Sequence, residues 1–270
     1  MTPNVLSIAG SDPSGGAGIQ ADIKAISANG AFGMAALTAL TVQNTTGVQG
    51  IHLVPPAFVQ SQITSVFDDI SVHAVKIGMI ANAEIAQAVA NALSGRDVPI
   101  VLDPVMIAKG GAALLDPDAV GVVRDALLPM ATVLTPNLPE AAHLLGTDVA
   151  TTRPEMETQG RALCGLGCKA VLMKGGHLDG AESPDCLVTK DTATWFESPR
   201  TLTQNTHGTG CTLSSALAAQ IAQGGDIVTA VSAAKSYVTH AIAQADRLQV
   251  GTGHGPVHHF AHLFDTSKGA

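Results

Sequence analysis

The sequence predicts an α/β fold with a mostly parallel central sheet and helices on both of its faces. Short apolar runs of strand length alternate along the chain with longer segments of helical periodicity. Apolar residues make up 46% of the chain and charged residues only 13%, which is typical of strands that are buried on both faces. A chain of 270 residues can bury a sufficient core without disulfides or metal, so we expect a single domain over 1–270.

The expected strands are short apolar runs that end at turn-forming residues. Gly10 follows the first of them, and Pro104 stops the fourth. The runs lie at 5–9, 35–42, 73–78, 99–103, 131–135 and 169–174, and a β-hairpin of 187–189 and 194–196 follows.

The expected helices carry recognisable start and stop signals. Pro56 is tolerated in a first turn, Gly224 and Gly225 end a helix, and Asp226 can cap the next one. The helices are expected at 17–29, 56–69, 84–93, 118–128, 138–145, 155–166, 209–223 and 227–246.

Charge and composition exclude several classes of protein. The net charge is −8 and no Lys/Arg cluster is present, which argues against a nucleic-acid partner. No apolar run reaches the ~18 residues of a membrane helix, and the N-terminus has no basic segment of a signal peptide. The four cysteines fit neither a zinc pattern nor a disulfide scaffold. We therefore expect a cytoplasmic protein.

The stretch 206–217 combines a Gly-rich turn with the start of a helix. Gly208 and Gly210 flank Thr209, and the following residues are small and mostly apolar. The unpaired N–H groups and the dipole at a helix N-terminus suit an anion. Cys211 falls in the first turn, where the pKa of a thiol tends to fall. The alternative is a turn whose glycines only permit a sharp bend before a core helix.

Residues that could bind or react with a ligand gather at the expected carboxyl ends of the strands, where open parallel sheets bind ligands. These residues are Gly10, Asp12, Gln43, Asn44, Gly78, Met79, Asp103, Thr135, Asn137 and Lys174. Each also has a purely structural interpretation. Asp103 could belong to a turn, Asn137 and Glu140 could cap a helix, and Lys174 could be a solvated strand end.

Together these residues supply the parts of phosphoryl transfer. Asp103 and Glu140 could hold a hydrated Mg²⁺, and Lys174 could bind the phosphates of a donor. The N–H groups at 208–211 could stabilise the transferring group, with Cys211 facing the acceptor hydroxyl. The loop after the first strand matches neither G-x-G-x-x-G nor G-x-x-x-x-G-K-[ST]. A nicotinamide oxidoreductase and a P-loop enzyme therefore lose their main support.

Eight motifs in order give the chain a resemblance that covers nearly its whole length. They are AGSDPSGGAGIQAD at 9–22, TVQNT at 41–45, VKIGM at 75–79, DPV at 103–105, TPNLPE at 135–140, KGGH at 174–177, THGTGCTLSSAL at 206–217 and GHGPVHHF at 253–260. The sequence resembles the ribokinase-like superfamily and, within it, the hydroxymethylpyrimidine/phosphomethylpyrimidine kinases of thiamine biosynthesis.

The resemblance implies a three-layer αβα fold and a kinase that uses ATP and Mg²⁺. Its substrates would be 4-amino-5-hydroxymethyl-2-methylpyrimidine and then the monophosphate, which becomes the diphosphate. The resemblance also implies a homodimer and a loop, rather than a separate lid domain, that covers the site. It leaves open whether a monovalent cation is a further cofactor.

The resemblance also assigns roles to residues. Gly208, Thr209 and Gly210 would form the catalytic anion turn, and Thr209 would bind the nucleotide together with Lys174 and Asn137. An Asp acts as base at the position of Cys211 across the wider superfamily. We predict that Cys211 is the base here, provided that the helix start lowers its pKa.

Gln43 is the residue predicted to recognise the aminopyrimidine substrate through hydrogen bonds. Its amide offers an acceptor beside a donor, which complements the ring nitrogen and exocyclic amine of an aminopyrimidine. The structural alternative is a strand-end glutamine bonded to nearby backbone. By the family match, the same pocket would be lined by Gly10, Ala17, Asp22, Met79 and Val105. His207 is expected to be satisfied by backbone.

Two other functions remain open from the sequence. One is a pyridoxal kinase on the same fold, which Cys211 and the pair Gln43 and Asn44 disfavour. The other is a non-catalytic ligand-binding relative, against which the intact Asp103, Glu140 and Lys174 argue.

Overall fold

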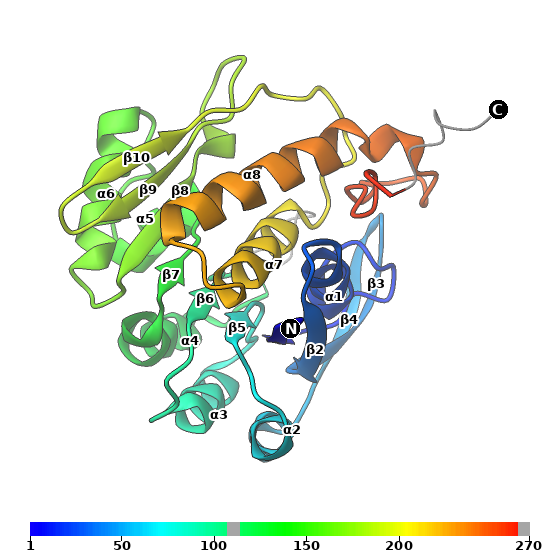
Figure 1. The fold of residues 1–270 in the computed structure, drawn as a ribbon, viewed down its shortest axis with the longest axis vertical. Coiled ribbons are helices and arrows are strands. Elements are labelled where there is room, and N and C mark those ends of the chain that lie inside the picture. The colour runs from blue at the N-terminus through cyan, green and yellow to red at the C-terminus, as the bar shows by residue number, and fades with distance from the viewer. Residues whose placement is uncertain (107–113, 264–270) are drawn as a thin grey trace.

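A computed structural model describes residues 1–106 and 114–263, and it contains an eight-stranded sheet with helices on both faces (Figure 1). The strand order is β10-β9-β8-β7-β6-β5-β1-β2. In this sheet the six strands β8, β7, β6, β5, β1 and β2 run parallel to their neighbours. Strand β9 is antiparallel to both β8 and β10. The bounds are β1 Asn4–Ala9, β2 Phe32–Leu37, β5 Ala74–Ile77, β6 Ile100–Leu102, β7 Val133–Leu134, β8 Ala170–Lys174, β9 Asp185–Thr189 and β10 Ala193–Phe196.

The helices form two layers that bury alternate residues of the strands. One layer contains α1 (Gly18–Ala28), α7 (Thr209–Ala222) and α8 (Ile227–Ala243), and the other contains α2 (Pro56–Asp69), α3 (Ala83–Leu93), α4 (Pro117–Val122), α5 (Leu138–Leu145) and α6 (Arg153–Cys164). Val5 packs in the core beneath α7 and α8, whereas its neighbour Leu6 packs in the core of the other layer. Because successive side chains point to opposite faces of the sheet, both the odd and the even positions of each strand must be apolar. The continuous apolar runs in the sequence predicted this. The predicted fold class is confirmed.

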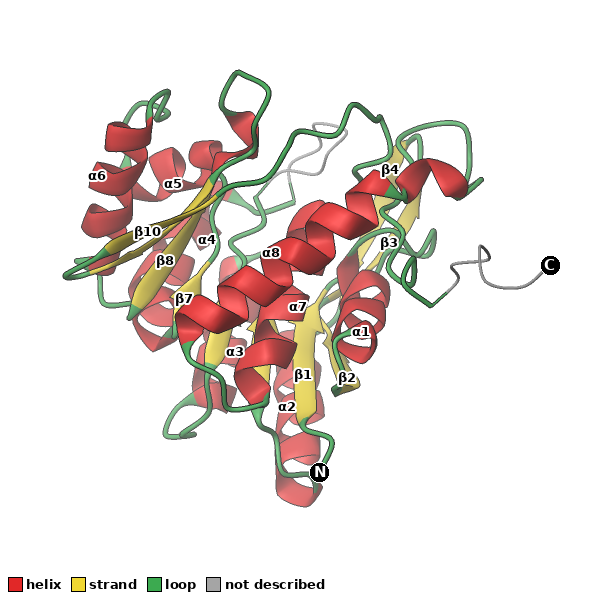
Figure 2. Cartoon of the chain, turned by 45° about the horizontal axis from the view of Figure 1, so that its top comes forward, coloured by secondary structure: helices red, strands yellow, loops and turns green. Residues whose placement is uncertain are grey.

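The segment predicted as one strand at 35–42 is two strands in different sheets. The break falls at Thr38, because its N–H still donates to the carbonyl of Ala9 on β1 while its own carbonyl accepts from the N–H of Val54. After this break β3 (Ala39–Asn44) leaves the main sheet and pairs antiparallel with β4 (Gly47–Leu53), which Val54 follows. The sequence analysis missed β4, because its two glycines and polar residues weaken the strand pattern. Figures 1 and 2 show this β3–β4 ribbon beside α1 and β2, at one edge of the main sheet.

The remaining elements agree with the predicted segments within a few residues. The helix expected at 118–128 is α4 followed by a π-helical turn, Val123–Leu127, and a 3-10 turn, Leu128–Met130. Further 3-10 turns lie at Gly175–His177 and Ala245–Arg247. Among the described residues, no helix combines the length and the apolarity needed to span a bilayer.

Candidate active site

A cavity of about 580 Å³ opens at the carboxyl ends of the parallel strands, beside the start of α7. Every predicted site residue except Asp22 lines it. Those residues are Gly10, Ala17, Gln43, Met79, Asp103, Val105, Asn137, Glu140, Lys174, Gly208, Thr209, Gly210 and Cys211. The fold therefore brings together side chains that lie up to two hundred residues apart, as expected for a parallel sheet.

Asp22 does not line the cavity, and this corrects its predicted contact with substrate. Its side chain is fully buried on α1, where the carboxylate accepts from Lys76 at 2.8 Å, Ser7 at 2.6 Å and Ser215 at 2.8 Å. Lys76 lies on β5 and does line the cavity. Burial lowers the pKa of Lys76, but the charge and the hydrogen bond of Asp22, together with the charges of Cys211 and Asp103, outweigh burial, so the pKa lies above its ordinary value. Asp22 thus keeps Lys76 positively charged at the wall of the cavity.

The anion turn before α7 is shaped by Gly208. This residue has φ +76°, and a Cβ there would collide with the carbonyl oxygen of Gly16. Only glycine accepts both conditions without strain. The next residues begin α7, whose first N–H groups have no partner within the helix. Gly210 lies close to Lys174 Nζ and Asp103 Oδ2, with 3.3 Å and 3.5 Å left to a Cβ. The helix terminus and the charged residues therefore face one another.

Cys211 lies at this helix start, but its environment differs from the prediction. Burial raises the pKa of the thiol to about 11; Lys76 and the N–H of Gly18 lower it, while Asp22 and Asp103 raise it further. The expectation that the helix start lowers this pKa was wrong in direction. Desolvation and two nearby carboxylates outweigh the favourable groups.

Lys174, Asp103 and Glu140 form a charged cluster at the ends of β8, β6 and β7. Lys174 Nζ lies 2.9 Å from Asp103 Oδ1 and 3.9 Å from Glu140 Oε2. Burial would raise the pKa of Asp103, but Lys174 and Lys76 hold it below its ordinary value. Burial raises the pKa of Glu140 to about 7, with Lys174 opposing and Asp103 adding to the rise. The two adjacent carboxylates could supply oxygen ligands to a cation.

The capping interpretation of Asn137 and Glu140 is also confirmed. The Asn137 side chain accepts from the N–H of Glu140, and Glu140 Oε2 accepts from the N–H of Asn137, both at 2.8 Å. This capping box fixes the start of α5 at the rim of the cavity. The structural interpretation therefore holds, and both residues also line the cavity, so their predicted roles in binding stay open.

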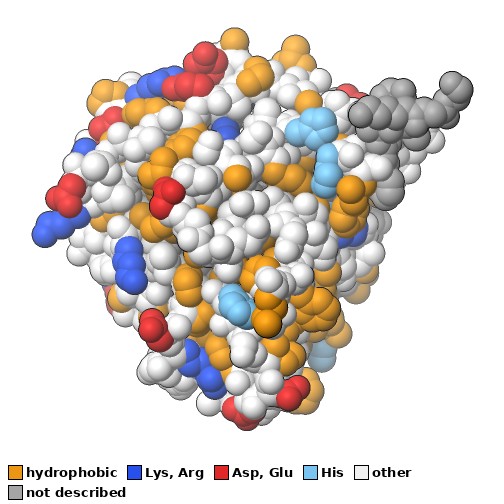
Figure 3. All heavy atoms as spheres, viewed as in Figure 1, with side chains coloured by type: hydrophobic (Ala, Val, Ile, Leu, Met, Phe, Trp, Pro, Cys, Tyr) orange, Lys and Arg blue, Asp and Glu red, His pale blue; other side chains and the backbone are white. Residues whose placement is uncertain are grey.

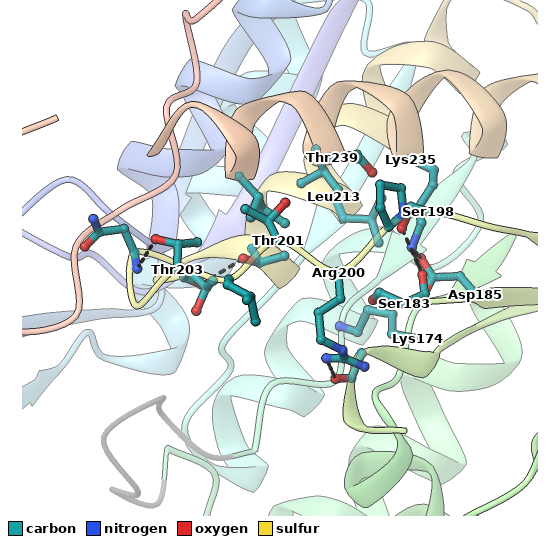
Figure 4. A pocket seen from close by; sticks show the side chains of 18 of the residues that line it. Lys174, Ser183, Asp185, Ser198, Arg200, Thr201, Thr203, Leu213, Lys235 and Thr239 are labelled. Atoms are coloured by element: carbon teal, nitrogen blue, oxygen red, sulfur yellow. Dashed lines mark hydrogen bonds and ion pairs between the residues drawn. The ribbon is translucent and has the colours of Figure 1, made fainter. Parts of the chain in front are cut away.

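A second, larger cavity of about 990 Å³ adjoins the first and shares Lys174, His177, Thr206 and Thr209 with it. Figure 4 shows its polar and apolar walls, among them Arg200, Leu213 and Lys235. Arg200 donates to the carbonyls of Gly176, Leu178, Gly180 and Glu182 and so fixes the loop at 176–182. Lys235 of α8 is paired with Asp185 of β9 at 2.6 Å. The sequence analysis missed this cavity, since its loop residues follow no periodic pattern.

His207 is satisfied by a side chain rather than by backbone, which corrects the expectation. Its Nε2 lies 2.7 Å from Asp12 Oδ2 and 3.4 Å from Gln43 Nε2. Gln43 follows an irregularity between Val42 and Gln43 in the β3–β4 pairing. No spacing rule joins residues 12, 43 and 207, so only the fold could reveal this contact.

Solved structures with the same fold define the class of protein. The chain is similar to Bacillus subtilis pyridoxal kinase in an ADP complex, with 35% identity, a TM-score of 0.90 and coverage of 98% of this chain and 100% of that one. It is also similar to phosphomethylpyrimidine kinase from Clostridium difficile 630, with 42% identity, a TM-score of 0.80 and coverage of 89% and 100%. Fold and site together define a ribokinase-like phosphotransferase for small molecules.

Sequence relatives identify the family within this class. The phosphomethylpyrimidine kinase family matches residues 12–258. The hydroxymethylpyrimidine/phosphomethylpyrimidine kinase of Escherichia coli (strain K12) is 54% identical, over 95% of this chain and 97% of its own length. The enzyme of the same description from Rhizobium meliloti (strain 1021) is 50% identical, over 96% and 98%. The chain belongs to the phosphomethylpyrimidine kinase family.

Proposed function

We propose that the chain transfers the γ-phosphoryl group of ATP to 4-amino-5-hydroxymethyl-2-methylpyrimidine and then to its monophosphate, in thiamine diphosphate biosynthesis. The observation that carries the proposal is one cavity that joins the Gln43 amide to the anion turn at 208–211. The amide complements an aminopyrimidine edge, and the turn suits the transferring phosphoryl group. Family membership supports the same reaction.

In the first step the substrate hydroxyl oxygen bonds to the γ-phosphorus while the bond from phosphorus to the ADP oxygen breaks. The hydroxyl proton passes to Cys211 Sγ, and the form that accepts it is the thiolate. Lys76 and the N–H of Gly18 favour this form, whereas burial, Asp22 and Asp103 oppose it, so the thiolate is a minor form at neutral pH. Lys174 and the N–H groups at 208–211 stabilise the negative charge on the transferring group.

The second cavity is the proposed nucleotide site. It shares Lys174 and Thr209 with the substrate cavity, which supports a position for the phosphates of a bound nucleotide at the common wall. Apolar side chains of Leu213, Val238 and Ile242 offer a surface for the base. Asn137 lines the substrate cavity beside Lys174 and is proposed to contact the phosphates.

Asp103 and Glu140 fit a hydrated Mg²⁺ that is bound together with the nucleotide phosphates. Both carboxylates line the cavity near Lys174, and Mg²⁺ commonly uses one or two carboxylates, phosphates and water. The described residues offer no cluster of three acidic, His or Cys side chains around a metal, which agrees with a cation that arrives with the nucleotide. When bound, Mg²⁺ would neutralise phosphate charge.

We also propose that the chain acts as a single-domain homodimer in the cytoplasm. Exposed apolar side chains support the dimer, among them Phe32 of β2, Leu40 and Val42 of β3 and Phe58 of α2. Figure 3 shows hydrophobic side chains gathered over β2 and the adjoining ribbon, while Lys and Arg are scattered on this face. All four cysteines are free thiols, as is usual in a reducing compartment.

Wild-type protein with Mg-ATP and each candidate acceptor provides the test of this function. We expect coupled ADP release with the hydroxymethylpyrimidine and with its monophosphate, and little with pyridoxal. Fast turnover of pyridoxal with silent pyrimidines would contradict the proposal. It would assign the chain to vitamin B6 salvage instead. The similarity to a pyridoxal kinase is the reason to test this alternative.

Replacing Gln43 by glutamate is expected to raise the KM for the hydroxymethylpyrimidine about 10- to 100-fold. An ionised carboxylate cannot donate to the ring nitrogen, so one hydrogen bond is lost and two acceptors face each other. Steady-state kinetics at saturating ATP measure the effect. Gln49→Glu on the exposed part of β4 is the matched control, and equal KM values for Gln43→Glu and wild type would exclude the contact.

A further inference from the structure

Three polar side chains meet at one corner of the substrate cavity. Gln43 comes from β3, Asp12 from the loop after β1, and His207 from the loop before α7, and all three line the cavity. The two loops are in direct contact, because a Cβ on Gly16 would overlap the ring of His207. The proposed function uses Gln43 but gives no role to Asp12 and His207.

The surroundings of Asp12 determine which ring nitrogen of His207 carries hydrogen. The Asp12 carboxylate is 1% exposed, and four groups donate to it. Oδ1 accepts from the N–H and the hydroxyl of Ser14, and Oδ2 accepts from the N–H of Ala17 and from His207 Nε2 at 2.7 Å. Burial would raise the pKa of Asp12, but these hydrogen bonds hold it below its ordinary value. A carboxylate only accepts, so His207 Nε2 is a donor.

This donor decides how the Gln43 amide is oriented. An amide nitrogen of Gln43 at 3.4 Å from His207 Nε2 would bring two donors together. The amide oxygen would then lie 3.3 Å from the hydroxyl of Thr41, which already donates to the carbonyl of Ser11 at 2.9 Å. The two amide orientations have the same shape. With the amide turned over, Oε1 is the longer, second acceptor of the single Nε2 hydrogen that His207 donates to Asp12, and Nε2 donates to Thr41 Oγ1, so neither contact brings two donors together.

We propose that the Asp12–His207 pair is a positioning device that fixes the Gln43 amide with its oxygen toward His207, and thereby selects 4-aminopyrimidines over 4-oxopyrimidines. The inference rests on the proposed function and deepens it. The fixed amide keeps one lone pair on Oε1 and one N–H on Nε2 for the ligand. The exocyclic amine donates to Oε1, and the adjacent ring nitrogen accepts from Nε2. A 4-oxopyrimidine presents the opposite pattern, acceptor against acceptor and donor against donor.

The same orientation directs the reacting group of the substrate. On the pyrimidine ring the amine lies between the ring nitrogen and the hydroxymethyl group. With the amine bound on the His207 side of the amide, the hydroxymethyl group continues in the direction of His207. His207 directly precedes the turn at 208–211 and Cys211. Recognition of the edge and delivery of the hydroxyl therefore require the same amide orientation, and the reverse orientation would turn the hydroxyl away.

The test compares kcat and KM for the 4-amino substrate and its 4-oxo analogue in wild type, His207→Ala and His207→Gln. In His207→Ala the amide can turn over, so the KM for the aminopyrimidine is expected to rise about tenfold. The ratio of kcat/KM for the amino and oxo compounds should fall by about tenfold or more, because the reversed amide matches the oxo compound and turns the hydroxyl of the amino compound away. Glutamine can donate to both Asp12 and Gln43, so His207→Gln should recover most of the discrimination.

Each outcome decides the proposal. A folded His207→Ala that keeps the wild-type ratio overturns it, as does a loss confined to kcat and the KM for ATP, which would indicate a structural role only. If His207→Ala does not fold, His207→Leu fills the space of the ring without its donor, and a retained ratio in that variant overturns the proposal. Wild-type protein that phosphorylates neither pyrimidine overturns the proposed function as well, whereas active wild type with an unchanged ratio in the variants overturns only this inference.

Discussion

Cys211→Ala is expected to lower kcat by about two to four orders of magnitude, the usual contribution of a general base. The thiolate takes the hydroxyl proton, and no other group has been given that role. Burial raises the pKa of this thiol to about 11, so the thiolate fraction grows as pH rises. The kcat of wild type should therefore climb with pH across the alkaline range, and the variant should lose this climb. Coupled ADP release at saturating substrates measures both.

Two controls separate the chemistry of Cys211 from its volume. Cys211→Ser keeps the size but has a far less acidic hydroxyl, so it should resemble the alanine variant. Cys164→Ala removes a half-buried thiol on α6 that lines neither cavity, and it should retain activity. If Cys211→Ala kept most of the wild-type kcat, the base would have to be sought elsewhere.

Asp22→Ala is expected to lower the free energy of unfolding by about 3 to 5 kcal/mol, the typical effect of removing one partner of a buried ion pair. Both side chains of the Asp22–Lys76 pair are fully buried, and their atoms lie 2.8 Å apart. The variant leaves Lys76 with an uncompensated charge and leaves the hydroxyls of Ser7 and Ser215 without their acceptor. Urea unfolding followed by circular dichroism measures the change.

A double variant and a surface pair test the cause of this loss. Asp22→Asn combined with Lys76→Met removes both charges, so it should be more stable than Asp22→Ala. Asp125→Ala breaks the exposed pair with Arg124, where both side chains are about half exposed or more. It should change stability by less than about 1 kcal/mol. Equal losses for Asp22→Ala and Asp125→Ala would show that burial of the pair does not matter.

The parallel sheet was predictable because its strands obey a local rule. Residues buried on both faces give continuous apolar runs, and Val5 and Leu6 pack in opposite cores as that rule requires. The order of the strands was not predictable, since it depends on which helix crosses which face. The break at Thr38 was also hidden, because the backbone of this residue bonds to Ala9 on one side and to the distant Val54 on the other.

The candidate site was predictable where chemistry coincides with strand ends. Asp103 follows β6, Lys174 is the last residue of β8 and Gln43 lies near the end of β3, and all three line the cavity. The prediction for Asp22 failed because a carboxylate in a motif carries no sign of whether it faces a ligand or a buried lysine. The prediction that the pKa of Cys211 is lowered failed for a similar reason. The helix start is visible in the sequence, but the desolvation and the neighbouring acids come from other elements.

The position of α7 late in the chain has a consequence for biosynthesis. This helix packs on α1 and on the central strands β1, β5 and β6, and Ser215 on it completes the polar shell of Asp22 across 193 residues. Ribosomes add about 5 to 20 residues per second, so α7 emerges roughly 10 to 40 s after Asp22. Until then one face of the nascent sheet stays exposed to water, and so does the ion pair of Asp22 and Lys76. Folding of the sheet core must therefore wait until most of the chain has been translated, and a nascent chain that stalls before α7 presents that apolar face to chaperones.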